Sequence, residues 1–163
     1  MKDIYSVQLY YKKLKKSSKQ RMMKIKIKKL NPLAFVPIKA HATDAGFDLY
    51  ATSKTIDENR NVVYGCGLAF EIPEGYMGLV FPRSSNARTQ LVLSNSVGVI
   101  DAGYRGEVTA KFKSISPLHE VEYQIGERFA QIIFLPIPNI ELEVAEELSE
   151  SERGSGGYGS SGL

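Results

Sequence analysis

From residue 24 onward, apolar residues come in short runs, and Gly, Pro, Asn or Asp separates each run from the next. Short apolar runs between turn-forming residues are typical of β-strands. The expected strands are residues 46–51, 62–72, 76–82, 91–100, 107–113 and 129–137. Only residues 84–90 and 144–152 are expected to form a helical turn or two. The regular spacing predicts an all-β barrel or jelly roll without internal repeats.

The alternation in "KIKIKKL" (24–30) predicts one more strand, half-buried along one face. "PEGY" (73–76) predicts a turn, and "DAGYRG" (101–106) predicts the bend of a hairpin. The chain has 163 residues, of which 43% are hydrophobic. This length and composition are those of one domain with a buried core.

Cysteine and histidine are scarce. Cys66 is the only cysteine, and the two histidines, His41 and His119, lie far apart in the sequence. These counts exclude an internal disulfide and a multi-cysteine zinc site. A metal, if the protein uses one, is therefore expected to be a hard cation bound by oxygen atoms. Catalysis is expected to depend on carboxylates.

Basic residues are concentrated at the start of the chain. The first 29 residues contain eleven Lys or Arg and one acidic residue. The remainder contains ten Lys or Arg and seventeen acidic residues. Residues 1–22 are thus expected to be a disordered basic extension. This extension either binds nucleic acid or another anionic surface, or simply precedes a β domain at 23–148. A Gly-rich arm is expected at 149–163.

No apolar run approaches the roughly 20 residues of a membrane span. The first residues also lack the apolar core of a signal peptide. We therefore expect an intracellular, cytoplasmic protein with no membrane partner.

The segment "SNSVGVIDAGYRGEVTAKF" (94–112) is the richest in candidate chemistry. Asp101 follows the apolar run 97–100, where a strand meets a turn. A carboxylate held there could orient and deprotonate a water molecule. Asp before Ala-Gly also forms ordinary turns, so both interpretations stay open. Tyr104 would offer an aromatic ring to a sugar or a base.

"AGFDLYA" (45–51) places Asp48 in an apolar strand, on the face opposite Phe47 and Leu49. One interpretation is that Asp48 caps nearby backbone amides. The other is that it binds Mg²⁺ through water, because this ion keeps several of its waters.

Two further segments carry polar groups. "FPRSSNAR" (81–88) supplies Arg83 and two hydroxyl groups, which suit a phosphate chain, although similar strings also cap helices. In "GERFAQII" (126–133), Arg128 and Gln131 interrupt an apolar segment. Gln131 is either a ligand contact or the outward-facing residue of an edge strand.

The tail "RGSGGYGSSG" (153–162) has the composition of a disordered loop. Its glycines would equally allow the backbone to wrap closely around an anion. Arg153 adds a charge suited to a terminal phosphate, and Tyr158 adds a ring.

Taken in order, "AGFDLYA", "PRSS", "NSVGVIDAGYRGE", "GERFAQII" and "RGSGGYGSSG" resemble the five motifs of the trimeric deoxyuridine triphosphatase (dUTPase) family. The resemblance covers residues 24–162. It implies a distorted β jelly roll, a homotrimer with active sites at subunit interfaces, and a C-terminal arm that closes over the site. It also implies Mg²⁺-dependent hydrolysis of dUTP to dUMP and pyrophosphate, which keeps uracil out of DNA and supplies dUMP for dTMP synthesis.

The resemblance also implies roles for single residues. Asp101 would be the base for the water that attacks the α-phosphorus, and Asp48 would hold Mg²⁺ through water. Tyr104 would pack under the deoxyribose and exclude a 2′-hydroxyl. Phosphate contacts are implied for Arg83, Ser84 and Gln131, and contacts to the uracil edge for the backbone near Asn95, Gly98 and Thr109. Ser85 and Val99 are also expected to bind the substrate. In the arm, Arg153 would grip the γ-phosphate, Gly154 would also contact the substrate, and Tyr158 would stack on the base.

The sequence departs from the family pattern at two positions. Ser85 stands where the second motif often has Gly, and Tyr158 stands where the last motif usually has Phe. "RSSNAR" (83–88) also resembles the related dCTP deaminases, but these need a glutamate where this chain has Lys111. Two alternatives to a dUTPase therefore remain: a dCTP deaminase relative, and a nucleotide-gated regulatory protein on the same scaffold.

Overall fold

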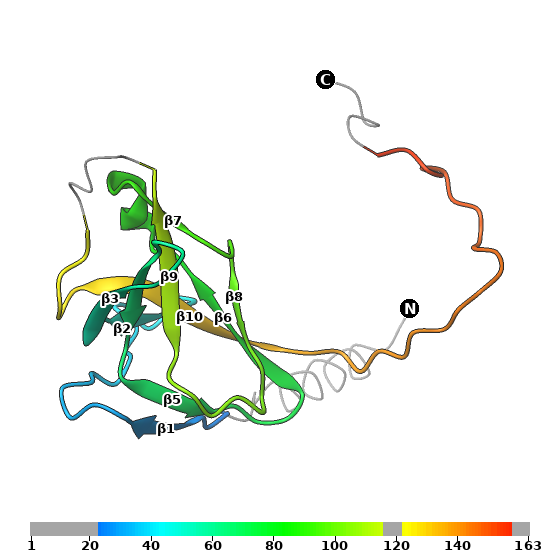
Figure 1. Ribbon diagram of the computed structural model, residues 1–163. Coiled ribbons are helices and arrows are strands. Elements are labelled where there is room, and N and C mark those ends of the chain that lie inside the picture. Colours follow the sequence, from blue (N-terminus) through cyan, green and yellow to red (C-terminus); the bar gives the residue numbers. More distant parts are fainter. Residues whose placement is uncertain (1–22, 116–121, 158–163) are drawn as a thin grey trace, which may run out of the picture.

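The computed structural model describes residues 23–115 and 122–157 (Figure 1). The basic extension 1–22 and Tyr158 lie outside the described residues. The strands are β1 (Lys26–Lys29), β2 (Phe47–Tyr50), β3 (Ser53–Ile56), β4 (Val62–Gly65), β5 (Leu68–Glu71), β6 (Tyr76–Phe81), β7 (Leu91–Leu93), β8 (Gly98–Ile100), β9 (Thr109–Ser114) and β10 (Arg128–Pro136). The 3₁₀ helix η1 (Ser84–Arg88) falls within the segment that was expected to be helical.

The strands form two four-stranded antiparallel sheets and one antiparallel ribbon. The sheet orders are β2-β10-β6-β8 and β3-β4-β9-β7, and β1 pairs with β5. An aromatic cluster lies in the core, where the ring centroid of Tyr64 is 5.5 Å from that of Phe129, 5.7 Å from that of Tyr123 and 5.9 Å from that of Phe112. Phe112 and Phe129 come from different sheets, so this cluster joins them. The prediction of an all-β fold is confirmed.

Two predicted strands are each divided in two. The predicted strand 62–72 is interrupted at Gly67, whose φ of 68° is a backbone conformation that glycine adopts readily and other residues rarely do. A larger residue would not fit there, because its Cβ would lie 2.8 Å from the Cβ of Asn31. β4 and β5 therefore enter different sheets. Residues 91–100 break at a turn in which Ser96 has a φ of 60°. As a result, β7 and β8 also belong to different sheets.

Three other local predictions were wrong. All four residues of β1 are exposed, so the predicted half-buried strand buries little beyond Ile25. β3 was not expected, because its four residues are all exposed and "SKTI" shows no apolar alternation. Residues 101–106 do turn, with the Tyr104 N–H donating to the Asp101 carbonyl at 3.1 Å. The flanking strands β8 and β9 do not pair, so the turn does not close a two-stranded hairpin.

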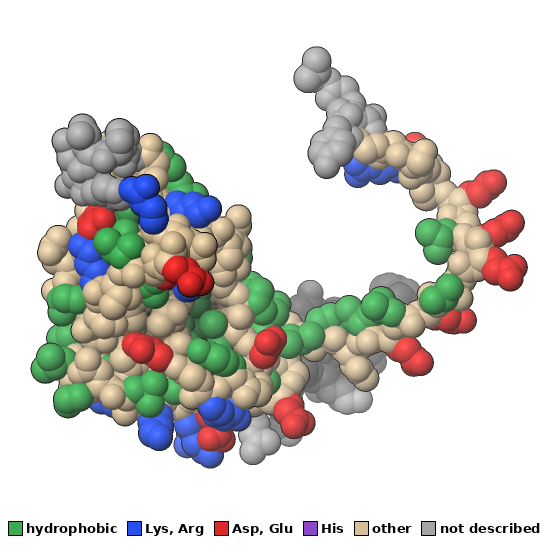
Figure 2. Space-filling view, in the orientation of Figure 1, with side chains coloured by type: hydrophobic (Ala, Val, Ile, Leu, Met, Phe, Trp, Pro, Cys, Tyr) green, Lys and Arg blue, Asp and Glu red, His purple; other side chains and the backbone are tan. Residues whose placement is uncertain are grey.

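After β10 the chain leaves the body as an extended segment, residues 137–157 (Figure 1). The expected helical turns at 144–152 are absent from this described segment, which is exposed throughout. Figure 2 shows acidic and apolar side chains along it. Ile140, Leu142 and Val144 alternate there with Glu141 and Glu143. Among the described residues, no helix has the length and apolar character needed to cross a membrane.

Candidate functional site

Strand pairing brings three of the sequence motifs together. In the register of β2 with β10, Asp48 lies opposite Gln131. In the register of β10 with β6, Gln131 lies opposite Phe81, and the chain continues from Phe81 through Pro82 to Arg83. Asp48, Gln131 and Arg83 therefore meet at one end of this sheet, although 83 positions separate the first from the second along the chain.

The Asp48 carboxylate is held by two guanidinium groups. Its Oδ1 accepts a hydrogen bond from Nε of Arg83 at 2.7 Å, and its Oδ2 accepts one from Nη1 of Arg128 at 3.1 Å. The side chain of Asp48 is 14% exposed and that of Arg83 is 22% exposed, so this pair is partly shielded from water. Asp48 does not cap backbone amides with these oxygens, which decides against that interpretation of the sequence.

A cavity of about 280 Å³ lies beside this pair. It is lined by Ala40, Asp44, Ala45, Gly46, Asp48, Arg83, Ser84 and Gln131. A Cβ at Gly46 would lie 2.5 Å from Oε1 of Gln131, so a larger residue there would displace the end of that side chain. Gln131 uses that space and donates from Nε2 to the carbonyl of Pro82 at 3.0 Å. We call this cavity the anion cavity, because a guanidinium, an amide and a hydroxyl group converge on it.

Ser85 lies on the other side of Arg83. Its Oγ accepts a hydrogen bond from Nη1 of Arg83 at 3.1 Å. Ser85 lines a second polar cavity with Tyr50, Tyr123, Arg128 and others, so the structure separates it from Ser84. Arg83 thus contacts Asp48 with one nitrogen and Ser85 with another.

The helix η1 that carries these serines is fastened to the body through Asn86. Tyr123 donates from its hydroxyl to Oδ1 of Asn86 at 3.0 Å, and Nδ2 of Asn86 donates to the Leu91 carbonyl at 2.7 Å. Thr89 also donates to Oδ1 of Asn86, at 3.1 Å. These contacts fix the start of η1, and with it the direction of Arg83.

A second group of predicted residues lines a separate cavity of about 280 Å³, here called the base cavity. Its lining consists of Val80, Leu93, Ser94, Asn95, Gly98, Thr109, Ala110 and Lys111. Asn95, Gly98 and Thr109, the residues for which the resemblance implied contacts to the uracil edge, are therefore neighbours. Val99 is not part of this lining and is 58% exposed.

Asp101 and Tyr104 lie in the turn that follows β8. The Tyr104 hydroxyl donates to the carbonyl of Glu107 at 2.9 Å, which lays its ring across Gly106. A Cβ at Gly106 would collide with that ring. Asp101 and Tyr104 are both exposed. Among the described residues, no hydrogen bond or ion pair joins this turn to the anion cavity.

The arm residues stand apart from both cavities. Arg153 donates from Nε to the carbonyl of Gly156 at 2.9 Å, and Gly154 adopts a φ of 53°. These are contacts within the arm itself, which lies away from the body (Figure 1). In this single chain, Arg153 and Gly154 therefore lie apart from the cavities that hold the other predicted site residues.

Sequence reasoning noticed Arg128 only as a polar interruption and gave it no role. It shares Asp48 with Arg83, and the signal that would have revealed it is the pairing of β2 with β10. It also missed the ion pair of Lys111, whose Nζ lies 2.9 Å from Oδ2 of Asp57. At the position where a dCTP deaminase needs a glutamate, this chain therefore has a lysine that is paired with Asp57.

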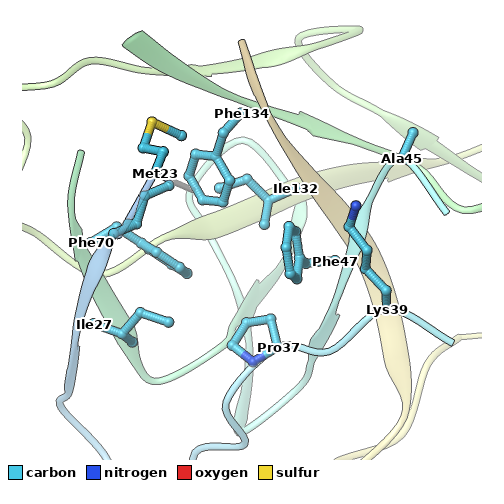
Figure 3. A pocket seen from close by; sticks show the side chains of 10 residues that line it. Met23, Ile27, Pro37, Lys39, Ala45, Phe47, Phe70, Ile132 and Phe134 are labelled. Atoms are coloured by element: carbon cyan, nitrogen blue, oxygen red, sulfur yellow. The ribbon is translucent and has the colours of Figure 1, made fainter. Parts of the chain in front are cut away.

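A further cavity of about 310 Å³ is apolar and contains none of the predicted site residues (Figure 3). Met23, Ile27, Phe70, Ile132 and Phe134 surround it, and Nζ of Lys39 lies 5.1 Å from the ring centroid of Phe47 at its rim. It lacks the convergent polar groups of the other two cavities. We therefore do not assign it to the same site.

The metal that the resemblance implies can be tested against the side chains. No group of three or more His, Cys, Asp or Glu that could hold a metal lies within residues 23–115 and 122–157. Mg²⁺ needs no such group, since proteins usually bind it through one or two carboxylates, waters and the phosphates of the substrate. Asp48, at the edge of the anion cavity, fits that limited contribution.

An all-β fold with one polar cavity at a sheet end and a second, separate cavity is an arrangement that a nucleotide-binding protein could use. The sequence model of the dUTPase family matches residues 34–162. The chain belongs to the dUTPase family, and its fold is the dUTPase jelly roll, as predicted.

Named relatives agree with this assignment. The deoxyuridine 5′-triphosphate nucleotidohydrolase of Rhodococcus erythropolis is 40% identical over 145 residues, which cover 86% of this chain and 87% of that protein. The protein of the same name from Nautilia profundicola is 41% identical over 143 residues, which cover 86% and 99%.

Solved structures are similar too. A dUTPase of Staphylococcus bacteriophage 80alpha with dUpNHpp has a TM-score of 0.75 and 30% identity, covering 87% of this chain and 100% of that one. A dUTPase variant of phage phi11, described as revealing the coordination of a structural Mg(II) ion, has a TM-score of 0.66 and 27% identity and covers 77% and 98%.

Proposed function

We propose that this protein hydrolyses dUTP to dUMP and pyrophosphate. The observation that carries the proposal is the separation of two cavities, one suited to phosphates and one lined by the backbone and amide groups of Asn95, Gly98 and Thr109. A deoxynucleoside triphosphate has a phosphate chain at one end and a base at the other, which would occupy the two cavities. The names of the relatives, and the binding of dUpNHpp, a dUTP analogue, by the phage 80alpha enzyme, favour uracil as the base.

In the proposed reaction, Asp101 accepts a proton from a water molecule as the water oxygen bonds to the α-phosphorus. The bond from the α-phosphorus to the oxygen that bridges it to the β-phosphorus breaks, and pyrophosphate leaves with that oxygen. Arg83, Ser84 and Gln131 hold the phosphates in line for this displacement. Such a reaction needs positioning and charge neutralisation more than covalent catalysis by the protein.

Mg²⁺ is the proposed cofactor, held by the phosphates, waters and Asp48, and when bound it neutralises phosphate charge. Tyr104 is proposed to support the deoxyribose with the face of its ring. The arm, through Arg153, Gly154 and Tyr158, is proposed to close over the nucleotide and exclude bulk water. A chain ordered by its ligand in this way would be extended when it is free.

The proposed assembly is a homotrimer whose sites draw on more than one copy. Two observations support it. Asp101 is not joined to the anion cavity within the described chain, and Leu142 and Val144 of the arm are 91% and 100% exposed. Apolar side chains in such a segment gain from burial against another surface. Light scattering on the purified protein should give the mass of three chains, and a monomer would contradict this part of the proposal.

The direction of attack can be tested with isotopically labelled water. Hydrolysis of dUTP in H₂¹⁸O should place the label in dUMP, because the attacking oxygen remains on the α-phosphorus. Label in pyrophosphate would contradict the mechanism. Asp101→Asn should leave dUTP binding largely intact and lower turnover at least about 10²-fold. Near-normal turnover of this variant would remove Asp101 from the role of base.

A second candidate function is nucleotide-gated regulation on the same scaffold. The likeness to phage 80alpha dUTPases, described as controlling transfer of virulence genes by a G protein-like mechanism, favours it. Pull-downs from a bacterial cell extract with and without dUpNHpp should then capture different proteins. Identical captured sets would argue against this candidate.

A further inference from the structure

The base cavity is joined to a distant turn by a continuous chain of hydrogen bonds. This turn, residues 57–61, connects β3 to β4. Asp57 organises it, since Oδ1 of Asp57 accepts hydrogen bonds from the backbone N–H of Asn59 at 3.0 Å and of Asn61 at 2.9 Å. The Asp57 N–H in turn donates to the Asn61 carbonyl at 3.0 Å.

Asn61 carries the connection into the core. It is 6% exposed, and a buried amide is costly unless its donors and acceptor are satisfied. Its Nδ2 donates to both carboxylate oxygens of Asp57, at 3.1 and 3.0 Å, and its Oδ1 accepts a hydrogen bond from Oγ of Ser94 at 2.8 Å. The donor and acceptor pattern is consistent with one orientation of the amide.

Ser94 begins the turn that presents Asn95 to the base cavity. The Ser94 N–H donates to the Lys111 carbonyl at 2.8 Å, and the Ser96 N–H donates to the Leu93 carbonyl at 3.1 Å. Ser96 has a φ of 60°, which is uncommon for a residue with a side chain. Such a turn keeps its shape only if its surroundings hold it, and Asn61 contacts it from the side.

Asp57 also holds the opposite wall of the cavity. Nζ of Lys111 lies 2.9 Å from Oδ2 of Asp57, and this carboxylate is 17% exposed. Along β9, Thr109 and Lys111 share the exposed face, while Ala110 and Phe112 are buried. Thr109 and Lys111 both line the base cavity. Because Lys111 belongs to this wall, its ion pair with Asp57 fixes where the charged end of the side chain lies.

We propose that Asp57 is a positioning residue for the base cavity: through Asn61 it fixes the turn of Ser94 and Asn95, and directly it fixes Lys111. The inference rests on the proposed function of the cavity as the uracil site. Asp57 touches no substrate. It sets the width of the cavity, and therefore how well uracil is bound and how strictly the methyl group of thymine is rejected.

The test compares Asp57→Asn with Glu58→Gln, the same chemical change at an exposed neighbour in the same turn. Asp57→Asn should raise KM for dUTP about two- to tenfold, leave kcat within about twofold, and lower the ratio of kcat/KM for dUTP over dTTP. Glu58→Gln should match the unchanged protein. KM and the substrate ratio do not depend on the folded fraction, so partial unfolding alone would not produce this result.

Ser94→Ala is a second variant, which removes the hydroxyl that donates to Asn61 and leaves Asp57 in place. It should shift the substrate ratio in the same direction and by less. The positioning role is wrong if the unchanged protein hydrolyses dUTP and both variants keep its KM and its dUTP-over-dTTP ratio of kcat/KM. It is also wrong if the variants lose only kcat. In both cases the proposed function stands. If the unchanged protein does not hydrolyse dUTP, the proposed function fails and takes this inference with it.

Discussion

Nε of Arg83 lies 2.7 Å from Oδ1 of Asp48, although 35 positions separate the two residues in the chain. The contact forms because β10 lies between β2, which carries Asp48, and β6, which leads into Arg83. Arg128 binds the second oxygen of the same carboxylate. A phosphate chain entering the anion cavity would thus meet the guanidinium group of Arg83 already oriented by Asp48.

Arg83→Lys should lower kcat/KM for dUTP by about tenfold or more, because an ammonium cannot contact Asp48 and Ser85 with separate, fixed nitrogens. Steady-state kinetics would measure this loss. Arg88→Lys is the matched control, since Arg88 is the exposed last residue of the 3₁₀ helix that begins directly after Arg83. Equal kinetics for the two variants would show that the geometry around Asp48 does not matter for activity.

Gly106→Ala should weaken the selection of the sugar. The added Cβ collides with the ring of Tyr104 and displaces it from the carbonyl of Glu107. We expect the preference for dUTP over UTP to fall by about tenfold, measured as a ratio of kcat/KM. Gly103→Ala is the control, because a Cβ there meets no atom within 4 Å. A preserved preference in Gly106→Ala would separate Tyr104 from sugar selection.

A chain that ends at Glu152 should keep its thermal stability and lose most of its activity. Stability is preserved because residues 137–157 are exposed throughout and bury none of the core. Activity is lost because Arg153 and the residues after it are removed. Calorimetry and the dUTP assay measure the two effects separately. Full activity in the shortened chain would mean that the arm has no part in the reaction.

Cys66 provides a prediction about pH. Burial raises the pKa of its thiol from 9.0 to about 12, and Sγ donates to the Val108 carbonyl at 3.0 Å. Above pH 9 the unfolded chain releases this proton while the folded chain keeps it, so the free energy of unfolding should fall as pH rises through that window. Urea unfolding at about pH 8 and about pH 10.5 would measure the fall.

Cys66→Ala should show a smaller fall over the same interval, because only the thiol contribution is removed. Burial also raises the pKa of Tyr64, which contributes equally to both proteins and cancels in the comparison. Parallel pH profiles for the two proteins would contradict the buried, protonated state of Cys66.

Local patterns in the sequence predicted much of the fold. β6 falls within a predicted strand and β10 begins one residue before one, because each has a clear apolar run bounded by turn residues. β3 was missed because both of its faces are exposed. The division at Gly67 depends on a backbone conformation that an apolar run does not reveal. Local pattern decides which residues are extended, but it does not decide which sheet they join.

The sequence motifs predicted individual residues of the site but not the contacts between them. The ordered motifs selected Asp48, Arg83 and Gln131, and the structure brings them together. Their contact depends on strand pairings between segments far apart in the chain, which no local spacing encodes. The Asp57–Lys111 ion pair, across 54 positions, was missed for the same reason.

The most direct test of the account is pyrophosphate release with Mg²⁺ from dUTP, dTTP, dCTP and UTP, each supplied separately at equal concentration. We predict release from dUTP alone, because the base cavity selects uracil and Tyr104 selects the deoxyribose. Release from none of the four, with dUTP still bound, would contradict the proposed enzyme and favour the regulatory protein. Ammonia released from dCTP would contradict it in favour of a deaminase.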